Sequence, residues 1–352
     1  MGAQPKIKAL DSIAAPAALP VVFVPALFLA GLVAYKWNAA LLAIQKVRSA
    51  GVLSTRLDVV AFGQATGFVA AQHSLNYFAV IWPALTFGIL IGAAVRAFVP
   101  PEWFAQILSR KPLRAQVAAG VAGAPLMLCS CCVAPVFSAM YERSSRLGPS
   151  LAMMLASPSL NPAALVLTFL LFAPKVAAAR LLMAAVTVFL GGFVIERLFT
   201  RDTSLFNRKR TEYRTPAGLQ ETASAFFGSL LDMLIRTVPA LVLGVVSSML
   251  LIQYVPPGLL ASSGFRFFAV LAAASIAVPL ALPTFFEVPL ALGFLSAGAP
   301  VGAVAAFLFA GPAINLPSLL ALARSTNWRI AAVLAAVVWT VAATGGLILN
   351  SL

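Results

Sequence analysis

The three cysteines of this 352-residue chain, Cys129, Cys131 and Cys132, lie within four positions of one another in the apolar stretch GAPLMLCSCCVAPVFSAM. Thiolates prefer soft ions such as Cu(I) and trivalent arsenic or antimony. Calcium and magnesium call for clustered oxygen ligands, which the chain lacks. Zinc is disfavoured because His73 is the only histidine. The cluster, with Ser130 inside it, therefore predicts a site for a small thiophilic substrate.

Two prolines flank the cysteine cluster, and two more flank an equivalent stretch in the second half of the chain. Pro125 and Pro135 enclose the cysteines in APLMLCSCCVAP, and Pro279 and Pro289 stand at the same places in VPLALPTFFEVP. Proline inside a helix removes a backbone donor and clashes with the preceding turn, so we expect these prolines to break helices. Unpaired backbone groups at membrane depth must line a cavity or be buried in protein, so paired breaks indicate a transport site.

A second pair of matching motifs follows these stretches. ASPSLNP contains Ser157, Pro158 and Asn161, and AGPAINLP contains Pro312 and Asn315. The prolines predict further helix breaks. The asparagine amides donate and accept hydrogen bonds, so they either cap the broken helices or line the same cavity as the cysteines. Together with Ser157, they are candidate substrate-binding residues.

One carboxylate, Glu287, stands in the second proline-flanked stretch, in an otherwise uncharged run. An ionisable side chain inside a membrane is costly and is usually functional. Glu287 would ligate the substrate, balance its charge or carry a coupled proton. The alternative is a structural ion pair, for example with Arg236. We predict a coupling role for Glu287, with protons as the candidate coupling ion.

The composition places these motifs in an integral membrane protein. Hydrophobic residues make up 61% of the chain, charged residues only 10%, and the mean hydropathy is +0.98. Several windows of about 20 residues are apolar enough to cross the hydrocarbon core as helices. Because lipid cannot satisfy open backbone groups, we expect an all-α, polytopic helical bundle. The net charge of +14 then indicates basic cytoplasmic loops and not nucleic-acid binding.

The chain also contains an internal repeat. WPALTFGILIGAAVRAFVPP is matched by VPALVLGVVSSMLLIQYVPP with an offset of 156 residues, and the later motifs match with an offset of 154. The offset of 154 also places the Gly191–Gly192 pair on Gly345–Gly346. Loops that are basic in the first half are nearly uncharged in the second. We therefore predict two inverted-topology repeats, with proline-broken helices at the midplane.

The repeat divides the chain into four segments. Residues 1–72 contain an N-terminal anchoring helix and an amphipathic segment, and residues 73–198 form the first repeat with the cysteine motif. Residues 199–221, rich in Arg and Lys, form a basic cytoplasmic linker. Residues 222–352 form the second repeat with the Glu287 motif.

Three of these motifs carry a resemblance to a known family. Pro-Leu-x-x-Cys-Ser-Cys at Pro125 to Cys131, Ser-Pro-x-x-Asn ending at Asn161 and Gly-Pro-x-x-Asn ending at Asn315 resemble the predicted-permease family that contains the bacterial organoarsenical efflux permeases. The resemblance covers roughly residues 75–350. It implies export of trivalent organoarsenicals.

The resemblance also implies that Cys129 and Cys131 are the two cysteines that bind the arsenic or metal centre. The sequence departs from the family pattern at Cys132, where a small residue such as Gly is expected. This departure bears on the identity of the substrate more than on the class of transporter.

We therefore expect a multi-pass permease of the bacterial inner membrane and not an enzyme. The leading hypothesis is secondary-active efflux of a thiophilic substrate by alternating access, with the lipid bilayer as surroundings and no cofactor. No GxxxxGK[ST] motif for ATP binding is present. A transporter of a sulfur compound or other small solute that uses thiol relay is the alternative. A membrane thiol oxidoreductase ranks lower, because a disulfide between the adjacent Cys131 and Cys132 would close a strained ring.

Overall fold

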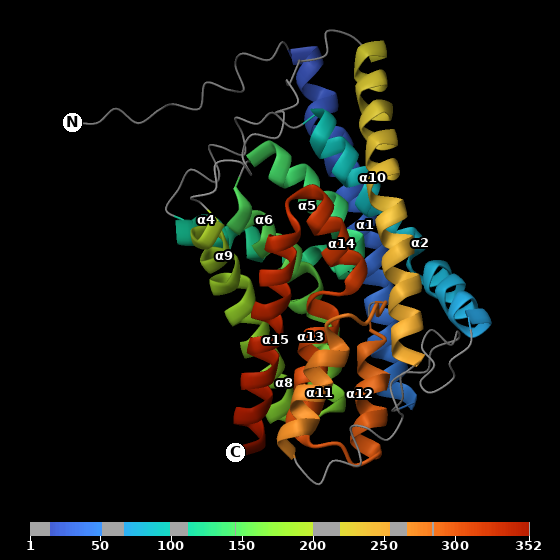
Figure 1. Ribbon diagram of the computed structural model, residues 1–352. Coiled ribbons are helices and arrows are strands. Elements are labelled where there is room, and N and C mark those ends of the chain that lie inside the picture. Colours follow the sequence, from blue (N-terminus) through green and yellow to red (C-terminus); the bar gives the residue numbers. More distant parts are fainter. Residues whose placement is uncertain are drawn as a thin grey trace.

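The computed structural model describes residues 15–50, 67–98, 112–144, 146–199, 219–253, 266–283 and 285–351, and these residues form a bundle of helices without strands (Figure 1). Four long helices are α1 (Ala15–Ala50), α2 (Gly67–Phe98), α10 (Leu219–Gln253) and α15 (Trp328–Ser351). Shorter elements of the first half are α4 (Pro112–Gly123), the 3₁₀ turn η1 (Ala124–Leu126), α5 (Ser130–Ser144), α6 (Leu147–Ser159), α7 (Pro162–Leu171), α8 (Pro174–Val186), the π-helical turn η2 (Thr187–Gly191) and α9 (Gly192–Phe199). Those of the second half are α11 (Arg266–Ala277), α12 (Glu287–Ser296), α13 (Val301–Ala313) and α14 (Leu316–Ser325).

The lengths and surfaces of these helices are those of a multi-pass membrane protein. Five helices are long and apolar enough to span a membrane, and the number rises to seven if each of two bent helix pairs counts as one span. Large apolar side chains such as Leu42, Phe68 and Trp328 are exposed on the outside. Lipid accommodates such side chains, whereas water would drive them inward.

The two bent pairs have nearly the same geometry in the two halves. The pair α6 and α7 bends by 40° and the pair α13 and α14 by 41°. Pro158 and Pro312 each lie in the last turn of the first helix of the pair, and that helix ends one residue later. α6 is buried at every residue and α13 is buried from Gly302 to Ala313, so these two helices form the centre of the bundle.

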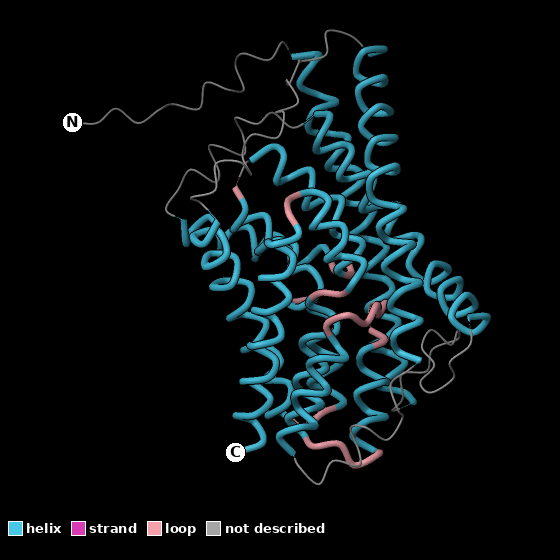
Figure 2. The backbone as a smooth tube through the Cα atoms, in the orientation of Figure 1, coloured by secondary structure: helices cyan, strands magenta, loops and turns pink. Residues whose placement is uncertain are grey.

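Two further pairs of helices, α4 with α5 and α11 with α12, are too short to span a bilayer. α11 has 12 residues and α12 has 10, which at 1.5 Å per residue gives about 18 and 15 Å, against a hydrocarbon core of roughly 30 Å. Figure 1 shows α4 and α5 in the upper part of the molecule and α11 and α12 in the lower part. Figure 2 shows loops at mid-height of the bundle, between these helices. The inverted symmetry itself stays a prediction that this arrangement fits.

Not every flanking proline breaks a helix. Pro125 lies in η1 and Pro279 just after the end of α11, both at interruptions. Pro135, in contrast, lies inside the continuous helix α5, and Pro289 is the third residue of α12. The first-turn N–H groups of a helix have no acceptor within it, so proline is tolerated at the position of Pro289. Pro135 only deprives the Cys131 carbonyl of its usual donor.

The N-terminal region also differs from the sequence expectation. A single helix of 36 residues, α1, covers much of the segment 1–72, in which an anchoring helix and an amphipathic segment were expected. α2 begins at Gly67, six residues before the predicted start of the first repeat. Most of the predicted linker, residues 200–218, lies outside the described residues.

Glycines allow the same close helix packing in both halves. A Cβ atom on Gly192 would lie 2.9 Å from the carbonyl oxygen of Gly148, and one on Gly346 would lie 2.7 Å from that of Gly302. Any larger side chain at these positions would push α9 from α6, and α15 from α13. Because Gly148 and Gly302 are themselves 154 residues apart, the contact recurs at the predicted offset.

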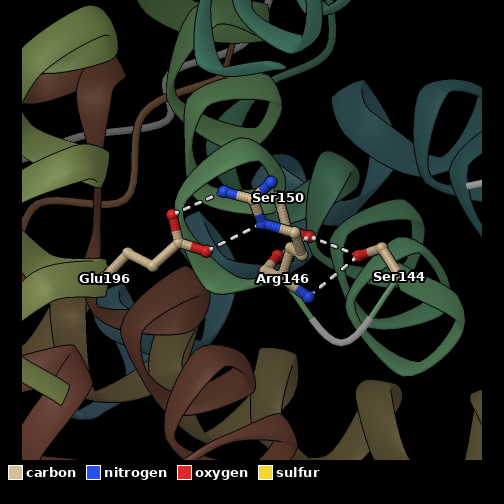
Figure 3. Close-up of polar contacts among 4 residues, drawn as sticks. All are labelled: Ser144, Arg146, Ser150 and Glu196. Atoms are coloured by element: carbon tan, nitrogen blue, oxygen red, sulfur yellow. Dashed lines mark hydrogen bonds and ion pairs between the residues drawn. The ribbon is translucent and has the colours of Figure 1, made fainter. Parts of the chain in front are cut away.

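An ion pair holds the turn between α5 and α6 at one end of the bundle (Figure 3). The Arg146 guanidinium donates from Nε and Nη2 to the two carboxylate oxygens of Glu196 in α9, at 3.2 Å each. The Ser144 hydroxyl accepts from the Arg146 amide, and the Ser150 hydroxyl donates to the Arg146 carbonyl. This network fixes the start of α6, the helix that leads to the first Asn-containing break.

Candidate functional site

The three thiols form one compact, buried cluster. The Sγ atoms of Cys129 and Cys131 are 3.1 Å apart, those of Cys129 and Cys132 2.6 Å, and those of Cys131 and Cys132 3.9 Å. All three cysteines are free, and none is more than 5% exposed. Ser130, between them in the chain, is 1% exposed. Three sulfur ligands this close together suit a soft ion or metalloid.

The backbone of the cysteine loop is held in place by the neighbouring break. Met127 adopts a left-handed conformation with φ of 50°, which is uncommon for a non-glycine residue and is typical of constrained sites. The Leu128 amide then donates to the Ser157 hydroxyl at 3.0 Å. The Cys129 carbonyl accepts from the amides of Cys132 and Val133, which begins α5. Ser157 therefore acts as an anchor of the cysteine loop.

Two long helices close the cluster from the side. The Tyr77 hydroxyl of α2 lies 3.1 Å from the Cys131 sulfur, and Tyr77 is fully buried. Gly88 of α2 lies so close to the Cys132 carbonyl that a Cβ atom there would collide with the oxygen. From α1, Lys36 is 9% exposed and its positive charge acts on Cys129. Buried cations within membrane helices usually have a functional partner.

The second-half loop is built by similar means from different side chains. The Pro279 carbonyl accepts from the Leu316 amide at 3.3 Å, and the Ala281 amide donates to the Ser248 hydroxyl at 2.7 Å. Phe285 has a φ of 78°, so this loop too contains a non-glycine residue with positive φ. In each half, therefore, the loop between the short helices is hydrogen-bonded to the break of the neighbouring bent pair.

Asn161 and Asn315 occupy equivalent positions, and each caps the helix after its break. The Asn161 Oδ1 atom accepts from the amides of Ala163 and Ala164, and the Asn315 Oδ1 atom accepts from Ser318 in a capping box. Both asparagines are fully buried. Their Nδ2 groups have no hydrogen-bond partner among the described residues. Two buried amide donors are thus left over for a ligand.

Glu287, the single charge in its stretch of sequence, forms a buried ion pair. Its Oε1 atom lies 3.0 Å from Nη2 of Arg180 in α8, and both residues are at most 1% exposed. The Arg180 Nη1 donates to the Thr168 hydroxyl at 2.5 Å, and that hydroxyl donates to the Ala164 carbonyl. The side chain of Arg236, the partner considered from the sequence, lies outside the described atoms.

A small cavity of about 10 Å³ lies between the two loops. Such a volume is about that needed to hold one water molecule. Its lining comes from both halves of the chain and consists of Leu128, Cys129, Pro158, Leu282, Pro283, Glu287 and Pro312. A thiol from the first half and a carboxylate from the second therefore face one enclosed space.

A larger cavity of about 270 Å³ lies farther along α5 and α14. Ser138 and Ser325 contribute hydroxyls 2.5 Å apart, and Arg96 pairs with Glu142 and with Asp232. Its lining is Arg96, Ser138, Glu142, Met233, Ile235, Thr237, Ala321, Arg324 and Ser325. Ser138 is six residues after Cys132, which is about 9 Å along a helix. We refer to this larger cavity as the vestibule.

Comparison with known proteins supports a membrane permease. The family model described as Predicted permease matches residues 68–351. The chain belongs to this predicted permease family. The permease is 26% identical over 260 residues to UPF0718 protein YraQ of Escherichia coli (strain K12), covering 73% of each chain. It is 28% identical over 90 residues to UPF0718 protein MJ0584 of Methanocaldococcus jannaschii, covering 26% of this chain and 25% of that protein. No solved structure matches.

Sequence reasoning missed three residues of the permease site. Arg180 is a single charge in the apolar run VAAARLLMAAV, so the reasoning that selected Glu287 applies to it as well. Lys36 lay at the edge of an apolar run and was assigned to an amphipathic segment. Tyr77 has no local signal at all, because its contact with Cys131 spans 54 residues.

Proposed function

We propose that this permease exports a thiophilic substrate from the bacterial cytoplasm by secondary-active alternating access. The substrate class comprises trivalent organoarsenicals, related metalloids and soft metal ions. One observation carries the proposal: three buried thiols have Sγ atoms within 4.8 Å of one another, and one of them, Cys129, lines a cavity that Glu287 also lines. Glu287 and the cysteines come from different halves, as a site between two moving halves requires.

The proposed chemistry needs no cofactor and no oxidant. A trivalent arsenical with two hydroxyl groups condenses with two thiols, forming two As–S bonds and releasing two water molecules. Cys129 and Cys131 are the proposed ligands, as the family resemblance implies, and Cys132 offers a third sulfur. A Cu(I) ion would instead displace thiol protons, for which Glu287 is the proposed acceptor and coupling group. Cytosolic thiols are kept reduced, so the cluster is competent to receive substrate.

The distribution of basic residues supports an orientation with the vestibule toward the cytoplasm. Arg146 lies at the turn between α5 and α6, and Arg324 and Arg329 lie at the turn between α14 and α15. Arg96, beside the vestibule, lies at the end of α2. The turn between α12 and α13 carries no charge. Basic residues collect on the cytoplasmic side, so substrate would enter from the vestibule end.

Efflux from cells tests the proposal directly. Cells that produce the wild-type permease should export methylarsonous acid and arsenite, whereas the Cys129→Ser/Cys131→Ser variant should accumulate both. Met154→Leu is the matched control, because it removes a fully buried sulfur outside the cluster. Equal resistance of wild type and the double variant, at equal protein levels, would remove the proposed role of the thiols.

The alternative substrate class is a sulfur compound, and one observation favours it. The unpartnered amide donors of Asn161 and Asn315, together with Lys36 near Cys129, would suit a sulfur oxyanion that also reacts with a thiol. Thermal stabilisation of the purified permease by methylarsonous acid, Cu(I), thiosulfate and sulfite separates the classes. Stabilisation by thiosulfate or sulfite alone would favour the thiol-relay transporter.

A further inference from the structure

Thr168, Arg180 and Glu287 are joined by a hydrogen bond and an ion pair, and the internal repeat gives this group an apolar counterpart. At the repeat offset of 154 residues, Thr168 corresponds to Leu322, Arg180 to Leu334 and Glu287 to Val133. All six residues are at most 1% exposed and lie in the core. One set of equivalent positions therefore holds an ion pair and a hydroxyl group, and the other set holds three apolar side chains.

This difference indicates that packing does not require the charges. Burying an ion pair costs desolvation, and replacement by apolar residues of similar volume is often neutral or stabilising. Leu322, Leu334 and Val133 show that such a set fits equivalent positions of this fold. The charged set therefore has a reason beyond stability, and Glu287 borders the cavity that Cys129 also lines.

The contacts of Arg180 fix the chemical character of that wall. Its guanidinium spans Thr168 in α7 and Glu287 at the start of α12, so it holds the carboxylate from the opposite half. The N-terminus of α12 adds a further preference for negative charge at Glu287. An ionised carboxylate accepts hydrogen bonds and donates none. A hydrocarbon group placed against it would strip the anion of solvent without compensation.

We infer that Arg180 and Thr168 are positioning residues that present Glu287 as an acceptor subsite, so that the preferred substrate keeps a hydroxyl or amino donor after the thiols bind it. This inference rests on the proposed function and names a narrower substrate class. Arsenite bound by two thiols loses two hydroxyls as water and keeps one, which donates to Glu287. Methylarsonous acid loses both hydroxyls and presents its methyl group instead.

The test compares these two probes on purified permease carrying Cys132→Ala, so that only Cys129 and Cys131 remain as thiol ligands. Dissociation constants are read from protection of the two thiols against a fluorescent maleimide. The Thr168→Leu/Arg180→Leu/Glu287→Val variant copies the apolar counterpart. It should shift the arsenite-to-methylarsonous acid affinity ratio at least about tenfold toward methylarsonous acid, because a site built for a hydrogen bond rejects ligands that lack it.

Two further variants keep the test decisive if the triple variant does not fold. Glu287→Gln should shift the ratio in the same direction, and Arg180→Lys should retain the original ratio. Equal changes for both probes, or no change, would mean a structural role and would overturn the inference while leaving the thiol site standing. Failure of both probes to protect the thiols of the unsubstituted permease would remove the proposed function, and the inference with it.

Discussion

The two loops between the short helices share several backbone features but carry different side chains. Each loop follows a short helix, contains a non-glycine residue with positive φ and is hydrogen-bonded to a neighbouring break. The first carries thiols and begins α5, whereas the second carries phenylalanines and Glu287 and begins α12. The shared features therefore build the cavity, and the features that differ decide its chemistry. Substitutions that remove either a shared feature or a feature present in only one loop test this interpretation.

Breaking the ion pair on one side only should have the largest effect. Arg180→Leu leaves the Glu287 carboxylate buried and unpaired, which should lower the free energy of unfolding by about 3–5 kcal/mol. Arg180→Leu/Glu287→Val, which removes both charges, should recover most of that loss. Denaturant unfolding in detergent measures both. Leu334→Arg, which buries an unpaired charge at the apolar counterpart, is the matched comparison. Equal stability of the single and double variants would contradict the assigned pairing.

Alanine substitutions at two equivalent, closely packed glycines should distinguish a loss of stability from an effect on the thiol site. Gly88→Ala places a methyl group against the Cys132 carbonyl, and Gly244→Ala places one against the Pro317 backbone. Each should cost about 1–3 kcal/mol of unfolding free energy, as overpacking does. Only Gly88→Ala should also change the maleimide reactivity of the cysteines. Gly228→Ala, with open space around the glycine, is the control. A change in the maleimide reactivity of the cysteines in Gly244→Ala would contradict the prediction that only Gly88 packs against the thiol site.

Removing the asparagine caps should have smaller and similar effects in the two halves. Asn161→Ala and Asn315→Ala each lose the acceptor at the start of a helix, which should cost about 1 kcal/mol. Asn161→Asp and Asn315→Asp keep that acceptor but lose the free amide donor, so they should keep the cap and weaken binding of a ligand that needs the donor. Asn327→Ala, at the start of α15, is a half-buried control. Unequal losses of unfolding free energy in Asn161→Ala and Asn315→Ala would show that the two asparagines are equivalent in sequence only.

The sequence analysis predicted the features that recur along the chain and missed those that depend on distant contacts. The matching prolines and asparagines located the bends at Leu160 and Ile314, because proline limits the helix around it whatever the packing. The same rule failed for Pro289, which lies in the first turn of α12, where proline is tolerated. It also failed for Pro135, which lies inside the continuous helix α5.

The polar residues that contact the cysteines and Glu287 show the same limit of sequence-based prediction. The sequence placed a thiol and an acid in matching stretches, and both line one cavity in the structure. It did not identify Arg180, although a lone arginine in an apolar run is visible, and it proposed Arg236 instead. Tyr77 and Lys36 come from helices outside the motifs. Only the packing of α1 and α2 brings them to the cysteines, and no local pattern encodes that packing.

The size of the space between the two loops has a mechanical consequence. A gap that holds one water molecule has no room for an arsenical or for a hydrated ion, so the two loops are closed against each other in the conformation described. Under the proposed function, substrate would occupy this space only after the two loops move apart. Because the loops belong to different halves of the chain, the proposed transport cycle would require the halves to separate at this cavity and close again.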